Sequence, residues 1–399
     1  MGGLSASARP PRHLLPAPSR GPHQMTTDYA VENGIGKLFE PFQIKDLVLP
    51  NRFIMPAMQR GWCADGAPLQ QLTNYYRRRV EGGVSLVISE SCAIAHPTAT
   101  KQPLACSMTS KTASSWRACI GEIHDAGGLF FVQLWHEGAF RNDEDGQTVS
   151  ASGLAYPGLE SGQAATAEQL QEIIDGYAES AWLAQLAGAN GVEIHCAHGY
   201  FLDQFLWAKT NLRNDDFGGN DLVARAQLHL RILKAIRLAC GESFVISLRF
   251  SQWKEHDFTA TIANTPEELG LFLKLMSEAG ADIFHASTRR FWEPAWEGSE
   301  RTLAGWTRAL SGKPTVAVGS VGLDRDVMAS FTDEGEAVGT VPETVRQLKD
   351  AVATDQFDLL AIGRSLIGDP DWVRKLQHGE TGKIRPFQKR DIADVEWDS

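Results

Sequence analysis

The chain has few cysteines and no long apolar run, and these two absences exclude several classes of protein. Its 399 residues include 6 cysteines, none of them in a Cys-x-x-Cys pair, so they predict neither a disulfide framework nor a cluster site. A reduced, cytoplasmic setting is therefore expected. No window approaches the roughly 18 uninterrupted apolar residues that a membrane-spanning helix needs, so we expect no membrane partner.

Positive charge is also scarce, and its scarcity argues against nucleic acid as a partner. The net charge is −11 and no basic stripe runs along the sequence, whereas phosphate binding along a nucleic acid would need one. A hydrophobic fraction of 43% and a charged fraction of 22% are ordinary for an enzyme with a sizeable core. A small molecule is the expected partner, and the chain is expected to act as a monomer or homo-oligomer.

The first 36 residues differ in composition from the rest. They are rich in Ser, Pro, Gly and Ala and contain no acidic residue before Asp28, so they cannot bury a core and are predicted to be a disordered leader. An arginine-bearing, acid-poor leader also resembles a transit peptide, and Met25 is an alternative start. Residues 37–399 are predicted to form one domain.

Eight short apolar runs alternate with helical stretches from Phe39 onward, which is the pattern of a parallel α/β sheet. Each run is almost continuously apolar, which indicates burial on both faces and favours a closed (β/α)8 TIM barrel over an open sheet. The predicted strands are Arg52–Ala57, Leu86–Ser89, Leu129–Leu134, Gly191–Ile194, Phe244–Leu248, Ile283–Ala286, Thr315–Val318 and Leu359–Ile362.

Three further stretches complete the predicted architecture. A helical period covers Ala167–Gly188 and ends at a glycine suited to a C-cap. Phe42–Leu49, before the first strand, reads as a β-hairpin that closes the floor of the barrel. Two long connections, one holding Ser150–Ala165 and the other covering Gly319–Phe357, are predicted loop insertions.

The residues that end the fourth strand carry the clearest chemistry, because catalysis in such barrels lies at the carboxyl ends of the strands. His195 and His198 are three residues apart and can both direct N–H groups at one acceptor, such as a carbonyl oxygen that gains negative charge. Tyr200 supplies a phenol that can give a proton to carbon. His195, Cys196 and His198 could instead bind a metal, but no third well-placed ligand is apparent, so no metal is predicted.

These motifs resemble the signature of the old yellow enzyme family of FMN-dependent ene-reductases. The run GVEIHCAHGYFLDQFL at 191–206 contains the His-x-x-His pair and the Gly-Tyr of that family. The run TNLRNDDFGG at 210–219 is similar to its Asn-Arg-Arg-x-Asp-x-Tyr-Gly-Gly segment. The resemblance extends from about Leu38 to Trp372.

The resemblance implies roles for the three polar residues. His195 and His198 would bind the carbonyl oxygen of an α,β-unsaturated carbonyl compound, and Tyr200 would protonate its α-carbon. Polarising the carbonyl makes the β-carbon electrophilic, so that hydride from NADPH or NADH can reach it through FMN. His195 is also assigned to the cofactor site.

The resemblance also places the flavin ring. Pro56, Ala57 and Met58 end the first strand and would line the isoalloxazine, and Gly83, before the second strand, would let the backbone approach it. Gln133 both donates and accepts, which matches the pyrimidine edge of the flavin. Arg249 would stabilise the anionic reduced flavin near N1 and O2.

The phosphate is expected after the seventh and eighth strands, where barrels commonly bind anions. FMN is favoured over FAD because no G-x-G-x-x-G opens a helix after an early strand. The predicted phosphate residues are Gly319, Ser320, Gly322, Gly363 and Arg364.

Some positions depart from the family pattern. Met58 stands where many members have Thr or Cys, and a thioether is at best a weak hydrogen-bond acceptor, so the flavin potential is expected to be lower. Leu212, Asn214 and Phe217 replace the arginines and tyrosine of the family segment at positions that look structural.

Aromatic residues are predicted to wall the substrate pocket. Trp135 ends the third strand, and Trp292 lies in an aromatic loop after the sixth, although this loop can also be read as ordinary packing. Trp62, in the loop after the first strand, is a similar candidate.

Two other functions compete with the ene-reductase. A flavin-free phosphate-binding aldolase or isomerase would need a lysine or a carboxylate base at a strand end; no lysine ends any of the eight runs, and Glu193 lies within a strand. A catalytically silent flavin-binding protein would be expected to lose the trio of His195, His198 and Tyr200. Relatives with an iron–sulfur cluster carry cysteines and further domains that this sequence lacks.

Overall fold

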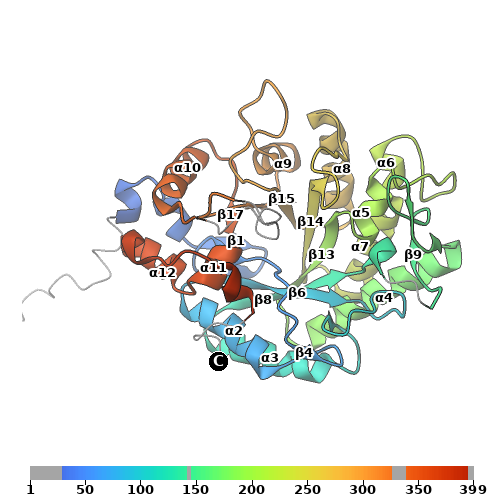
Figure 1. Cartoon of the computed structure of the whole chain (residues 1–399), viewed down its shortest axis with the longest axis horizontal. Coiled ribbons are helices and arrows are strands. Elements are labelled where there is room, and N and C mark those ends of the chain that lie inside the picture. Colours follow the sequence, from blue (N-terminus) through green and yellow to red (C-terminus); the bar gives the residue numbers. More distant parts are fainter. Residues whose placement is uncertain (1–28, 142–144, 326–337, 394–399) are drawn as a thin grey trace, which may run out of the picture.

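Eight parallel strands stand in a ring at the centre of the molecule (Figure 1), in a computed structural model that describes residues 29–141, 145–325 and 338–393. The ring closes because the last strand pairs with the first, Leu360 opposite Phe53. The strands are β3 (Phe53–Met55), β6 (Leu86–Ala93), β8 (Leu129–Trp135), β13 (Gly191–His198), β14 (Val245–Lys254), β15 (Ile283–Ser287), β16 (Thr315–Val318) and β17 (Leu359–Ala361). The predicted (β/α)8 TIM barrel and all of its strands are confirmed.

Helices follow the strands and cover the outside of the ring (Figure 1). The helix α4 shows why they form where they do: Thr166 and Gln169 make a capping box at its start, and Gly188, with φ of +98°, follows its end. The larger helices are α2 (Gln70–Glu81), α3 (Ala113–Asp125), α4 (Ala167–Leu186), α7 (Gln227–Cys240), α8 (Pro266–Ala279), α9 (Leu303–Ser311) and α10 (Val341–Ala353). The shorter ones are α5 (Phe201–Leu206), α6 (Leu222–Arg225), α11 (Arg364–Gly368) and α12 (Trp372–Gln377).

A β-hairpin closes one end of the barrel, as predicted. Its strands, β1 (Phe42–Ile44) and β2 (Leu47–Leu49), pair antiparallel. Ile44 and Leu49 are buried in one apolar cluster with residues at the amino ends of the barrel strands, such as Ile54 and Leu86. Apolar side chains therefore fill this end of the barrel, opposite the carboxyl ends of the strands.

Several short strands lie in the loops that connect the barrel strands to the helices. The first predicted insertion holds β9 (Val149–Ser150), β10 (Leu154–Tyr156), β11 (Leu159–Glu160) and β12 (Gln163–Ala164). The second holds α10, and its residues 326–337 lie outside the described residues. Two more pieces, β4 (Cys63–Ala64) with β5 (Ala67–Pro68), form a hairpin after β3, and β7 (Cys106–Ser107) pairs with β6.

The packed part of the chain begins before the predicted boundary at position 37. Ala30 and Ile35 are buried in the main apolar cluster, so these residues belong to the domain. The rest of the predicted leader, residues 1–28, lies outside the described residues. Within the described chain, no helix is both apolar enough and long enough to pass through a membrane.

Candidate active site

A cavity of about 390 Å³ opens at the carboxyl ends of the barrel strands. Its size suits a cofactor or small ligand, since such sites range over about 300–1,000 Å³. Most residues predicted from the sequence line it: Pro56, Ala57, Met58, Gln133, Trp135, His195, His198, Tyr200, Arg249, Gly319, Ser320, Gly363 and Arg364.

Four predicted residues lie elsewhere, and each has a physical reason. Trp62 packs edge-on against Tyr75, with 5.6 Å between ring centroids, and does not line the cavity. Gly83 precedes its strand and therefore lies at the amino end of the barrel, where a Cβ would come 3.2 Å from Val373. The N–H of Gly322 already donates to Thr344 Oγ1 at 3.1 Å, so it is not available to a phosphate. Trp292 packs edge-on against Phe291, with 5.2 Å between ring centroids, and does not line the cavity.

Other lining residues were missed by sequence reasoning. They share a position in loops or beyond the predicted strand ends, where no apolar run marks them. Among them are Gln59, Arg60, Ser91, Gln102, Trp253, Glu255, Ser287, Arg289 and Ile392. Glu255 directly follows β14, which runs six residues beyond its predicted end at Leu248.

The two histidines project into one region of the cavity. Their ring centroids are 5.2 Å apart, and His195 Nδ1 has no hydrogen-bond partner among the described residues. His198 Nε2 lies 2.8 Å from Ser287 Oγ, which also accepts a hydrogen bond from Arg249. This arrangement favours Ser287 donating to His198 Nε2, which leaves the Nδ1–H of His198 to donate.

Both imidazoles are neutral at physiological pH. Burial lowers the pKa of His195 to about 3, and the Arg249 guanidinium acts in the same direction. Burial and the same guanidinium hold the pKa of His198 well below its ordinary value. A neutral imidazole keeps one N–H, so the pair can offer two hydrogen bonds to an oxygen without bringing positive charge.

Tyr200 lies against the histidines in an aromatic enclosure. Its ring centroid is 5.5 Å from that of His195, 5.5 Å from Trp135 and 5.6 Å from Phe140. Its hydroxyl donates to Glu255 Oε2 at 3.5 Å. Burial and the charge of Glu255 raise the pKa of Tyr200 above its ordinary value, so the phenol stays protonated until a strong base draws its proton.

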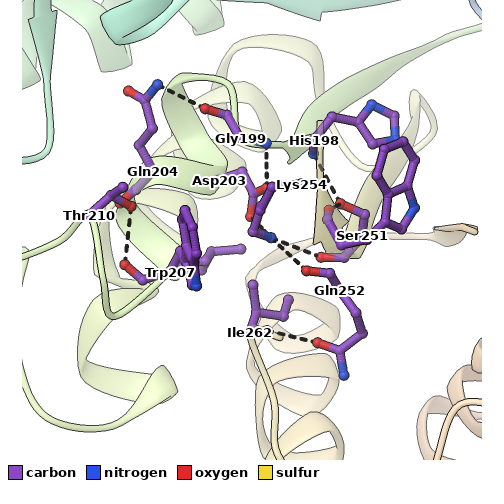
Figure 2. Close-up of polar contacts among 12 residues, drawn as sticks. His198, Gly199, Asp203, Gln204, Trp207, Thr210, Ser251, Gln252, Lys254 and Ile262 are labelled. Carbon is purple, nitrogen blue, oxygen red and sulfur yellow. Dashed lines mark hydrogen bonds and ion pairs between the residues drawn. The ribbon is translucent and has the colours of Figure 1, made fainter. Parts of the chain in front are cut away.

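A buried ion pair holds the turn between His198 and Tyr200 (Figure 2). His198 has φ of +67° and Gly199 has φ of +90°, a bend that the backbone does not adopt without support. The N–H of Gly199 donates to Asp203 Oδ2 at 2.7 Å, and Lys254 Nζ donates to Asp203 Oδ1 at 2.8 Å. The N–H of His198 donates to Ser251 Oγ at 3.0 Å. These contacts set the directions of the His198 and Tyr200 side chains.

Lys254 corrects one step of the sequence reasoning. The expectation that no lysine ends a strand is wrong, because β14 continues through polar residues and ends at Lys254. Its ammonium is fully bonded, to Asp203 Oδ1, to Gln252 O at 2.9 Å and to Ser251 O at 3.3 Å. It does not line the cavity and is not placed as a Schiff-base lysine.

A buried polar layer orients Gln133 beneath the cavity. Its Nε2 donates to Glu193 Oε1 at 2.8 Å, and its Oε1 accepts from Ser91 Oγ at 2.8 Å. Burial alone would raise the pKa of Glu193, but the interaction and hydrogen bond with His285, the charge of Arg249 and the hydrogen bond from Gln133 lower it to about 2. The amide of Gln133 keeps one N–H and one lone pair, which can meet a ring edge that both accepts and donates.

The far end of the cavity is suited to an anion. The lining of the whole cavity includes three guanidinium groups, those of Arg249, Arg289 and Arg364. Gly319 has φ of +141°, and a Cβ there would lie 2.6 Å from the carbonyl oxygen of Thr288, so only glycine fits. The neighbouring Gly363 has only Met58 Sδ and Pro56 Cγ within 4 Å of its Cβ position, at 3.5 and 3.9 Å. A bare backbone edged by guanidinium groups matches the needs of a phosphate.

A buried carboxylate supports the loop that carries part of the lining. Glu90 Oε2 accepts the N–H of Arg60 at 2.8 Å, which ties the loop after β3 to β6. Cys63 and Cys106 lie beside it, with ligand atoms all within 4.8 Å of one another. This is the only such group found in the described chain, and it does not include the histidines or Cys196.

The segment after α5, residues 210–219, does not line the cavity and makes local structural contacts instead. Asn211 Nδ2 donates to the carbonyl oxygens of Phe205 and Phe217, at 2.8 and 2.9 Å. Leu212, which departs from the family pattern, is 67% exposed and has little to contact. Phe217 is buried in the main apolar cluster, whereas Leu212 is exposed, so the expectation that these positions are structural stays a prediction for Leu212 and Asn214.

Comparisons with known proteins agree with this geometry. A model of the NADH:flavin oxidoreductase / NADH oxidase family matches residues 37–340. A NADH oxidase of Thermoanaerobacter brockii is 30% identical over 364 residues, which cover 87% of this chain and 52% of the relative, so the chain spans about half of that protein's length. A NADPH dehydrogenase of Halalkalibacterium halodurans is 26% identical, covering 85% of this chain and 93% of the relative.

The fold has solved counterparts. The structure of an old yellow enzyme homologue from Zymomonas mobilis superposes with a TM-score of 0.72 and 23% identity, covering 90% of this chain and 98% of that one. At that identity the likeness supports the fold alone, and the fold is the same.

Proposed function

Because the chain belongs to the NADH:flavin oxidoreductase / NADH oxidase family, the old yellow enzyme family that its motifs resemble, we propose that it is an FMN-dependent ene-reductase. Its substrates would be α,β-unsaturated carbonyl compounds, and NADPH or NADH would be the reductant. The observation that carries the proposal is the convergence of His195, His198 and Tyr200 on the wall of one cavity.

The residues of the cavity fit FMN. Pro56, Ala57 and Met58 would lie along the ring, Gln133 would meet its pyrimidine edge, and Arg249 would sit near N1 and O2. Gly319, Ser320, Gly363 and Arg364 would hold the phosphate. Arg249 Nε lacks a partner among the described residues, as expected of a group that awaits one. When bound, FMN takes a hydride from the nicotinamide and supplies it to the alkene.

The histidine pair would bind the carbonyl oxygen of the substrate. Each neutral imidazole can donate one hydrogen bond, and both are fixed before substrate arrives, so they stabilise the charge that develops on the oxygen without reorganising. Their neutrality matters, because a protonated pair would bind any anion that entered the cavity. The buried positions of both rings also exclude water from these hydrogen bonds.

Tyr200 would protonate the α-carbon. Its raised pKa makes it a weak acid toward water, but an enolate-like carbon is a far stronger base than water and can take the proton. Trp135 and Phe140 pack against its ring and hold the hydroxyl in place. Nicotinamide and enone would bind in turn, because both would use the same cavity.

All six cysteines are free and buried, which supports a reducing, cytoplasmic location. The same thiols give no reason to expect a disulfide-dependent fold.

The test is an anaerobic absorbance titration of the purified protein. Flavin bands that bleach with NADPH or NADH and return when 2-cyclohexenone is added would support the proposal. A protein that cannot be loaded with FMN would overturn it and favour the flavin-free barrel. Bands that bleach but do not return with an enone would mean that the electrons go to another class of acceptor.

A further inference from the structure

Glu255, to which the sequence analysis assigns no role, lies beside the proposed proton donor, Tyr200. It directly follows β14, it contributes to the lining of the cavity, and its Oε2 accepts the hydroxyl of Tyr200 at 3.5 Å. Among the described residues, the carboxylate of Glu255 is the hydrogen-bond partner of the Tyr200 hydroxyl. The backbone N–H of Glu255 donates to the carbonyl oxygen of His198 at 3.3 Å, so the turn that carries Tyr200 also fixes Glu255.

The surroundings of Glu255 favour its protonated form. Burial raises the pKa of its carboxyl, while the hydrogen bond from Tyr200 and the charge of Arg249 lower it by less. Glu137 adds negative charge near Tyr200, and burial lowers the pKa of the adjacent His256, which keeps that imidazole neutral. Lys254, next to it in the chain, is committed to Asp203 and does not neutralise Glu255.

The chemistry of Tyr200 creates a need that this carboxyl can meet. If Tyr200 gives its proton to carbon, it becomes a phenolate in an enclosure of aromatic rings that disfavours a charge. The phenol must recover a proton before the next turnover. When it is protonated, a carboxyl at hydrogen-bond distance is a better source than water, because it is the stronger acid and is already aligned.

We infer that Glu255 is the proton reservoir of Tyr200, a role that rests on the proposed ene-reductase function. The O–H bond of Tyr200 breaks and a C–H bond forms at the α-carbon. In the same step the carboxyl proton of Glu255 passes to the phenol oxygen, so that no phenolate is left, and solvent in the cavity afterwards returns a proton to Glu255. No electrons are exchanged in this relay. Each turnover takes one proton from solvent.

The inference predicts the sign of a pH dependence. Below its pKa the carboxyl of Glu255 is protonated and can supply Tyr200. Above that pKa it is a carboxylate, which supplies nothing and also makes the neighbouring phenol harder to deprotonate. Reoxidation by an enone should therefore slow as the pH rises through the raised pKa of Glu255.

The experiment is stopped-flow flavin absorbance on the FMN-loaded enzyme across pH 5–9, with reduction by NADPH and reoxidation by 2-cyclohexenone measured separately. Glu255→Gln keeps the size of the side chain but cannot release a proton. We expect its reoxidation to slow by about tenfold to a hundredfold at low pH and to lose the pH-dependent fall. Glu160→Gln, at an exposed position on β11, is the matched control and should follow the wild type.

A double variant distinguishes the relay from a general loss of structure. If Glu255 acts through Tyr200, Glu255→Gln should slow reoxidation no further when combined with Tyr200→Phe. Effects that multiply in the double variant, or a Glu255→Gln enzyme with the wild-type pH profile, would overturn the inference while leaving the proposed function intact. A wild-type enzyme that no enone reoxidises would overturn both.

Discussion

Replacing Lys254 by methionine should cost the protein a large part of its stability. The side chains of Lys254 and Asp203 are 1% and 0% exposed, and methionine keeps an unbranched chain while removing the ammonium. Asp203 would be left with only the N–H of Gly199 as a partner. Breaking a buried pair from one side typically costs about 3–5 kcal/mol, because the remaining charge is neither solvated nor paired.

Equilibrium urea unfolding, followed by circular dichroism, measures this change in free energy. Lys274→Met is the matched control, because Lys274 is 71% exposed and its pair with Glu278 spans 3.9 Å. Such surface pairs contribute little, so the control should change stability by no more than about 0.5 kcal/mol. Adding Asp203→Asn to Lys254→Met should recover part of the loss, since the amide is neutral and can still accept from Gly199.

The loss in the free energy of unfolding caused by Lys254→Met should also depend on pH. Burial raises the pKa of Asp203 and Lys254 lowers it, so removing Lys254 raises the pKa of the folded state further. A carboxyl whose folded pKa lies above its unfolded value stabilises the fold most at low pH and loses that contribution as the pH rises. Lys254→Met should therefore be closer to the wild type at pH 5 than at pH 8. A deficit below about 1 kcal/mol at both pH values would refute the account of this pair.

Other parts of the site give predictions of their own. Met58→Thr should raise the midpoint potential of the bound flavin, because a hydroxyl can hydrogen-bond the ring where a thioether cannot; equal potentials in a dye-equilibration titration would remove the idea. Gly319→Ala should cost about 1–3 kcal/mol in strain and weaken FMN binding, measured by flavin fluorescence. Gly298→Ala, with φ of +76° and nothing within 4 Å of its Cβ position, is the control and should bind FMN normally. His195→Ala should slow reoxidation by 2-cyclohexenone by about 10²–10³, the effect of losing one fixed donor to an oxyanion; a rate near wild type in stopped flow would mean that His195 does not bind the carbonyl.

The barrel was predictable because its core strands are apolar and short, and apolar runs are the strongest signal in a sequence. The ends of β13 and β14 were missed for the same reason. His195–His198 and Arg249–Lys254 continue the strands with polar residues mixed among apolar ones, and pattern reasoning assigns such stretches to loops. Several residues of the candidate site lie on these extensions, so the strand limits were predicted least well next to the cavity.

The differences between the predicted and the observed lining have separate causes. Gly83 was assigned to the flavin on the ground that a glycine lets the backbone approach a ligand, but a residue before a strand lies at the opposite end of the barrel from a residue after it. Ile392 lines the cavity from the far end of the chain, and no local pattern could have placed it there. Glu255 was missed because the predicted strand ended at Leu248, whereas β14 continues to Lys254.

The closure of the ring between β3 and β17 has a consequence for how the protein is made. β3 gains one of its two neighbours only when Leu359–Ala361 has been synthesised, and Ile392 reaches the cavity later still. Until β17 has paired with β3, the wall of the cavity next to Pro56 is incomplete and Gly363 is not yet in place beside it. A ligand held in the cavity would therefore gain its full set of contacts only when the ring closes, which couples ligand binding to the last step of barrel formation.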